Sequence, residues 1–66
     1  MSEAITLIVD GYVTLNDRQA LQDLKLHRQG LLLHLQEASG LDLSRSISQI
    51  SDELDVVEAG LARLDQ

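Results

Sequence analysis

The chain has 66 residues, a formal net charge of −6, 44% apolar residues and neither cysteine nor proline. The apolar fraction predicts a folded chain, and the lack of cysteine excludes disulfides and thiolate metal sites. Five cations on an acidic chain make nucleic-acid binding unfavourable, and no apolar run approaches the roughly 18 residues of a membrane span. We expect one cytoplasmic domain, residues 1–66, and no membrane association.

The first expected element is a β-hairpin over about residues 4–15. Residues 5–9 are apolar or β-branched, Asp10 and Gly11 are typical of a two-residue turn, and residues 12–15 suit a returning strand. An isolated hairpin is marginal in water. We therefore expect it to lie on the rest of the chain or to pair with a second copy.

Two long helices are expected next, over about residues 17–39 and 43–65. Asn16 is the expected N-cap of the first helix, with Gln19 completing a capping box, and Gly40 is the expected left-handed C-cap. A connection this short folds two helices back on each other. The pattern predicts an antiparallel αα-hairpin.

Each helix carries a seam whose members alternate spacings of three and four residues, as in a coiled coil. The seam of residues 43–65 is Leu43, Ile47, Ile50, Leu54, Val57, Leu61 and Leu64. The seam of residues 17–39 is Leu21, Leu24, Arg28, Leu31, Leu35 and Ala38. When the seams are packed antiparallel, the expected flanking pairs are Arg18–Asp65, Lys25–Glu58, His27–Glu53 and the small pair Ala20–Gly60.

The predicted fold class is therefore α+β: an N-terminal β-hairpin followed by a long antiparallel αα-hairpin (ββαα). A core of 66 residues roughly balances the conformational entropy of folding. Natural domains of this size gain stability from disulfides, metals or self-association, and this chain has no cysteine with which to form a disulfide. We expect a homodimer whose helices form a four-helix layer.

One apolar feature lies opposite the seam. Leu26 and Leu33 are seven residues apart on the outer side of the first long helix, among glutamines. The candidate interaction face is Gln22, Leu26, Gln29, Leu33 and Gln36. Two leucines in this arrangement normally do not face water. They are expected to be covered by the β-hairpin, by a second subunit or by a partner protein.

Arg28 is the candidate specificity residue because it occupies a seam position that is otherwise aliphatic. We expect its side chain to extend toward Glu53 or Glu58 and to help select the helix pairing, at a cost in stability. A role in a partner site is the alternative.

Catalytic and cofactor chemistry is not indicated. The chain shows no Ser-His-acid motif and no glycine-rich phosphate loop, so we expect no enzyme and no cofactor. His27 and His34 lie seven residues apart, about 10 Å in helical rise, which is too far for both to ligate one metal within a chain. No metal site is predicted.

A short segment resembles known families. Residues 10–15, followed by Arg18, Ala20 and Leu21, resemble the start of swapped-hairpin DNA-binding regulators and antitoxins. This sequence has Asn16 where that family carries a proline, and it continues as helix where the family adds strands. No functional residue is carried over from the resemblance.

The function expected from these patterns is binding. We expect a small non-enzymatic interaction module, an adaptor, inhibitor or assembly factor of bacterial or phage type, which acts as a homodimer and engages another protein. The alternative is a dimeric nucleic-acid-associated regulator or antitoxin-like protein, with arginines of two chains forming the contact surface.

Overall fold

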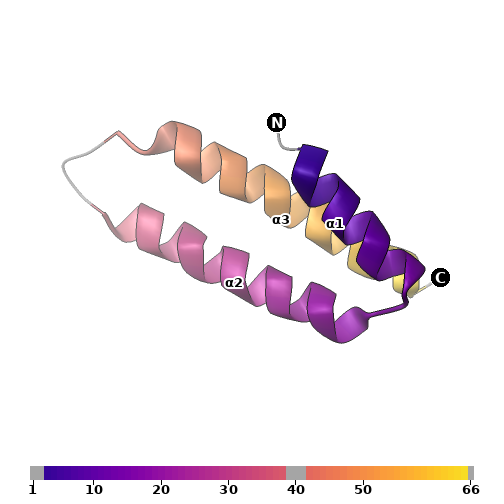
Figure 1. Ribbon diagram of the computed structural model, residues 1–66. Coiled ribbons are helices and arrows are strands. Elements are labelled where there is room, and N and C mark those ends of the chain that lie inside the picture. Colours follow the sequence, from indigo (N-terminus) through magenta and orange to yellow (C-terminus); the bar gives the residue numbers. More distant parts are fainter. Residues whose placement is uncertain (1–2, 39–41, 66) are drawn as a thin grey trace.

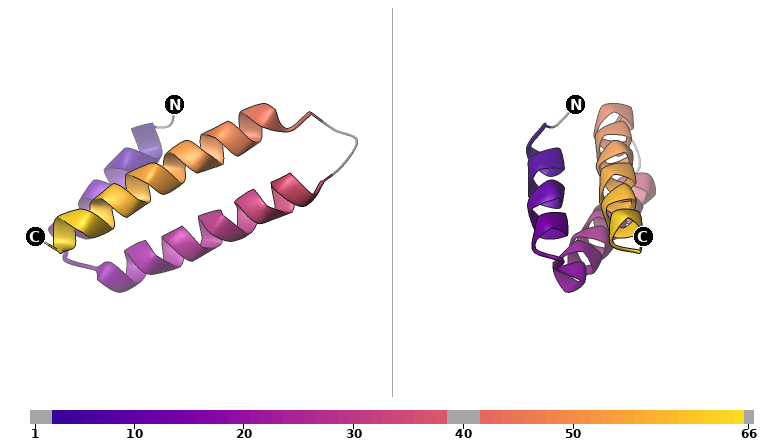
Figure 2. Two further views of the ribbon diagram at one scale, coloured as in Figure 1. Left: turned by 180° about the vertical axis from the view of Figure 1, so that it is seen from behind. Right: turned by 90° about the vertical axis from the view of Figure 1, so that its right-hand side faces the viewer.

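The computed structural model describes residues 3–38 and 42–65, and throughout these ranges the regular secondary structure is helical. The helices are α1 (Glu3–Thr14), α2 (Arg18–Glu37) and α3 (Ser44–Leu64). Helices α2 and α3 run antiparallel along the length of the molecule, and α1 lies beside the half of α3 nearer its C-terminal end (Figure 1). Figure 2 shows from two further sides that α1 adds a third helix at one end of the α2–α3 pair.

The expected β-hairpin is wrong, because residues 4–15 form α1 and its last turn and no strand occurs among the described residues. Isoleucine, valine and threonine each lower helix propensity by only about 0.5 kcal/mol relative to alanine. Burying an isoleucine or valine side chain contributes about 1.5–3 kcal/mol. Ile5 and Val9, one helical turn apart, are both buried. Their burial in the tertiary structure therefore outweighs the local preference for strand, and Asp10-Gly11 continues the helix.

Asn16 ends α1 and does not begin α2 as expected. Its φ of 55° lies in the left-handed region. The Asn16 N–H donates to the Val13 carbonyl at 3.0 Å and the Asp17 N–H to the Tyr12 carbonyl at 2.9 Å, which together make a Schellman motif. Asp17 is the N-cap of α2, since its Oδ1 accepts from the Ala20 N–H at 3.1 Å. The sharp turn between α1 and α2 therefore needs only three residues.

The antiparallel αα-hairpin is confirmed, and so is its register. Arg18 Nη2 lies 2.5 Å from Asp65 Oδ1, and Lys25 Nζ lies 3.9 Å from Glu58 Oε1. Both pairs are those expected from the seam alignment. The expected C-cap Gly40 lies outside the described residues.

The core is concentrated where three helices meet. Its buried members are Ile5 and Val9 of α1, Leu21 of α2 and Val57 of α3. At 1.5 Å of rise per residue, the 12-residue α1 is about 18 Å long and the 21-residue α3 is about 32 Å long. Helix α1 is therefore long enough to cover only about half of the hairpin.

Gly60 allows α1 to approach α3 closely. A Cβ placed at Gly60 would collide with Cγ1 of Val9, and it would lie 3.5 Å from Cγ2 of Val13. The seam alignment instead paired Gly60 with Ala20 of α2. The structure corrects this interpretation: the close neighbour is α1, because α1 is a helix that lies on the Gly60 side of α3.

Candidate interaction surfaces

The Gln/Leu face, which consists of Gln22, Leu26, Gln29, Leu33 and Gln36, is exposed along the outer side of α2. Leu26 is 66% exposed and Leu33 is 56% exposed. Covering by the N-terminal segment was one of the three expectations, and it is wrong because α1 packs at the Leu21 end of α2 and on α3. The face has no formal charge in a chain that is 24% charged.

Arg28 and Glu53 form an ion pair across the α2–α3 seam. Arg28 Nε donates to Glu53 Oε1 at 2.8 Å, and the two side chains are only 20% and 10% exposed. Glu53 was expected to pair with His27, but His27 instead accepts from Arg28 Nη1, with its Nδ1 at 2.6 Å. The seam position of Arg28 explains the difference, since its long side chain reaches Glu53 directly.

The Arg28–Glu53 pair stands at a boundary within the hairpin. Between this pair and the α2–α3 turn, the described seam residues are half-buried or exposed, and none is buried. A hollow of about 400 Å³ opens there between the helices. Its lining residues are Leu31, His34, Leu35, Ser46, Gln49 and Ile50. This half of the hairpin therefore lacks the third helix that covers the other half.

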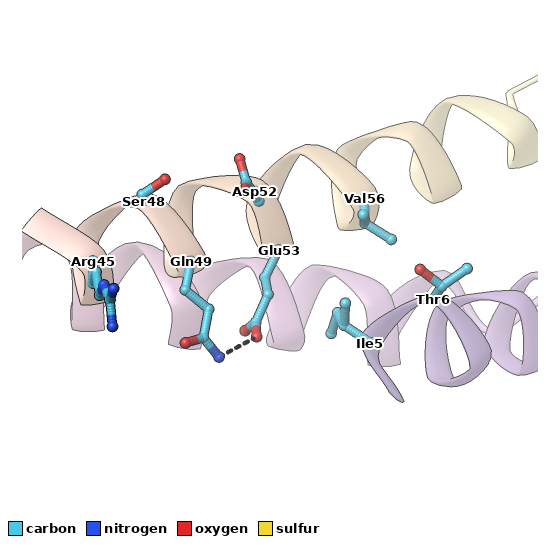
Figure 3. Close-up of a pocket in the computed structure, with 8 residues that line it drawn as sticks. All are labelled: Ile5, Thr6, Arg45, Ser48, Gln49, Asp52, Glu53 and Val56. Atoms are coloured by element: carbon cyan, nitrogen blue, oxygen red, sulfur yellow. Dashed lines mark hydrogen bonds between the residues drawn. The ribbon is translucent and has the colours of Figure 1, made fainter. Parts of the chain in front are cut away.

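A second hollow, of about 310 Å³, lies where the N-terminal end of α1 meets α3 (Figure 3). Its α3 wall is polar apart from Val56, and α1 contributes Ile5 and Thr6. Gln49 and Glu53 point to one side of α3, and Gln49 Nε2 donates to Glu53 Oε2 at 3.4 Å (Figure 3). Glu53 is thus already engaged by Gln49 and Arg28. The hollow marks the point at which the α1-facing side of α3 changes from apolar to polar.

An apolar surface that the sequence interpretation missed lies on α1. We call it the α1 outer face, and it consists of Ala4, Leu7, Ile8, Gly11 and Leu15, all exposed. Leu7 is 71% exposed, Ile8 45% and Leu15 74%. The β-hairpin interpretation placed residues 5–9 and 12–15 on two strands with Gly11 in the turn between them, so their common helical face was not recognised. Residues 4, 8, 11 and 15 are separated by four, three and four residues, and this helical spacing is the sequence signal that indicates the face.

Most lysine and arginine side chains form ion pairs with carboxylates of the same chain. Ion pairs join Arg18 to Asp65, Lys25 to Glu58, Arg28 to Glu53 and Arg63 to Asp10. These are four of the five lysine and arginine residues. Among the described residues, no three histidine, aspartate or glutamate side chains are arranged to hold a metal ion.

Over residues 3–38 and 42–65 the fold is a three-helix arrangement with exposed apolar faces on α1 and α2. No protein-family model matches the chain, and comparison with curated proteins and with solved structures finds no match either. Among the described helices, none is both long and apolar enough to cross a bilayer.

Proposed function

We propose that this protein is a non-enzymatic, cytoplasmic protein-interaction module that acts as a homodimer and binds a partner protein through the Gln/Leu face. The observation that carries the proposal is the exposure of Leu26 and Leu33 on an uncharged face of α2. Exposed apolar side chains that line up on one helix face are typical of helix-to-helix recognition sites.

The composition of the face supports a protein partner. Its leucines lie seven residues apart, so they project from the same side of the helix at every second turn. The glutamines between them offer both donors and acceptors without a charge to desolvate. Such a face suits an apolar helix of a partner with a polar rim, the usual composition of a protein interface.

The nucleic-acid-associated alternative is less well supported. Phosphate binding needs cations that are free to neutralise the backbone. Arg18, Lys25, Arg28 and Arg63 each already pair with a carboxylate of the same chain. A nucleic acid would have to compete with these pairs and with the net charge of −6.

The test compares partner capture by the wild type and by a variant carrying both Leu26→Gln and Leu33→Gln. Tagged proteins are used to capture partners from an extract of the native host, and bound proteins are identified by mass spectrometry. We expect a specific partner that the wild type retains and the variant loses. The control is Ala59→Gln with Ala62→Gln, which changes two exposed apolar residues on α3 and leaves the Gln/Leu face intact. Equal capture by all three proteins would refute the proposal.

A further inference from the structure

We propose that the α1 outer face is the surface on which two copies of this chain dimerise, with their α1 helices antiparallel. The inference rests on the homodimer named in the proposed function and assigns its interface. The face carries no charge, and its side chains Leu7 and Leu15 are the two most exposed large apolar side chains among the described residues.

The α1 outer face has the geometry of a coiled-coil seam. Four of its residues have the alternating spacing of four, three and four that a coiled-coil seam requires: Ala4, Ile8, Gly11 and Leu15. Leu15 still belongs to the helical turn, because its N–H donates to the Gly11 carbonyl at 3.0 Å. The seam therefore runs the full length of α1.

The sizes of the side chains select the antiparallel orientation. In an antiparallel pair, Ile8 lies opposite Gly11 of the second copy, and Leu15 lies opposite Ala4 of the second copy. Each large side chain then faces a small residue, the arrangement that fills an interface without voids. In a parallel pair each residue would face its own copy, so large side chains would meet large ones and glycine would meet glycine.

Gly11 supplies an independent argument. It lies in the interior of α1, where glycine lowers helix stability relative to alanine. A Cβ at Gly11 would meet nothing within 4 Å in the monomer, so no contact within the described chain requires a glycine there. By contrast, Gly60 accommodates Val9 within the chain. Ile8 against Gly11 of a second copy would repeat that contact between a β-branched side chain and a helical glycine.

Charge favours a second copy over a lipid surface as the occupant. The α1 helix contains Glu3 and Asp10 and no basic residue, and Asp10 is engaged by Arg63 at 2.7 Å. Helices that bind membrane surfaces usually carry lysine and arginine beside the apolar face. Two 12-residue helices give a small interface, so we expect a dissociation constant on the order of micromolar.

The first experiment is sedimentation equilibrium of the full chain at concentrations from about 1 to 500 μM, a range chosen to span the affinity expected for a small interface. Gly11→Gln should raise the dimer dissociation constant by about thirtyfold or more, because its side chain fills the space for Ile8 of the second copy. The matched control is Gly30→Gln, also at a mid-helix glycine with open space around it. Both substitutions should raise the melting temperature of the monomer, so loss of the dimer is separable from misfolding.

The second experiment tests the orientation with cysteines, which the natural chain lacks. An oxidised mixture of the Ala4→Cys and Leu15→Cys proteins should form a cross-linked heterodimer. Leu15→Cys alone should not cross-link. In the antiparallel pair, residue 15 of one chain lies opposite residue 4 of the other, so the two cysteines would be 11 residues apart along the helix axis, about 16 Å in rise. A disulfide needs Cα atoms within about 7 Å. Cross-linking of Leu15→Cys alone, without the mixed product, overturns the antiparallel interface.

The remaining outcomes separate this inference from the proposed function. If the dimer persists in Gly11→Gln but dissociates in Leu26→Gln with Leu33→Gln, the homodimer stands and its assignment to α1 fails. A wild type that is monomeric at every concentration overturns the homodimer, while capture of a partner through the Gln/Leu face is judged separately. Binding of a monomeric wild type to phosphatidylcholine vesicles overturns the second copy as the occupant.

Discussion

Arg28 and Glu53 form an ion pair that lies at the border between the three-helix and two-helix halves of the molecule. Arg28 Nε and Glu53 Oε1 are 2.8 Å apart, in a seam whose other members are aliphatic. Beyond this pair no described side chain is buried, whereas the core lies on its other side. The pair thus helps to fix the α2–α3 register at the point beyond which the described seam residues are no longer buried.

Removing one partner of this pair is expected to be more harmful than removing both. Arg28→Met leaves Glu53 largely buried and without its cation, and should lower the free energy of unfolding by about 3 kcal/mol. The double variant with Glu53→Leu should recover most of that loss, because two apolar side chains can pack in the same seam. Urea unfolding of the wild type, both single variants and the double variant measures the coupling. Additive effects would show that the pair contributes nothing specific.

Two glycines inside helices, Gly60 and Gly30, should respond to alanine in opposite directions. Gly60→Ala should destabilise by about 1–3 kcal/mol, because the new Cβ collides with Val9 and pushes α1 away from α3. Gly30→Ala should stabilise by about 0.5–1 kcal/mol, since its Cβ meets nothing and helix propensity improves. Thermal unfolding followed by circular dichroism distinguishes the two. A Gly60→Ala protein as stable as the Gly30→Ala protein would contradict the packing of α1 on α3.

The cap of α2 is expected to reside in Asp17 and not in Asn16. Asp17→Ala should cost about 1 kcal/mol, because the Ala20 N–H loses its acceptor. Asn16→Gly should be neutral or stabilising, since glycine adopts the positive φ at that position without strain. Denaturant midpoints of the two variants give the comparison. A larger loss for Asn16→Gly than for Asp17→Ala would restore Asn16 as the N-cap.

The carboxyl group of Asp42 is expected to titrate below its ordinary value. The Ser44 side chain, whose Oγ donates to Oδ1 at 2.6 Å, and then the Ser44 backbone N–H at 3.1 Å lower the pKa of Asp42. Because the folded pKa lies below the unfolded one of about 3.9, the contribution to stability is full above that pH. It is lost as the pH falls through the folded pKa. Carbon-detected NMR titration measures this shift, which should diminish in Ser44→Ala.

The αα-hairpin could be predicted from the sequence because it depends on the spacing of residues within each helix and on the length of the connection. Alternating spacings of three and four place apolar residues on one face of each helix, and a short connection forces the helices to be antiparallel. Complementary charges then select one register among several, as Arg18–Asp65 and Lys25–Glu58 show. The exposure of Leu26 and Leu33 has the same origin, since a residue opposite the seam faces outward.

The conformation of residues 4–15 was decided only by tertiary structure. Their sequence satisfies both a strand pattern and a helix pattern, and local propensity separates the two by little. Gly60, far along the chain, leaves room on α3 for Val9, and burial of Ile5 and Val9 there favours the helix. The sequence by itself thus determined the αα-hairpin, its register and the outward position of Leu26 and Leu33. The tertiary structure determined that the N-terminal segment is helical and that its other face remains uncovered, because that choice depends on a contact between distant residues.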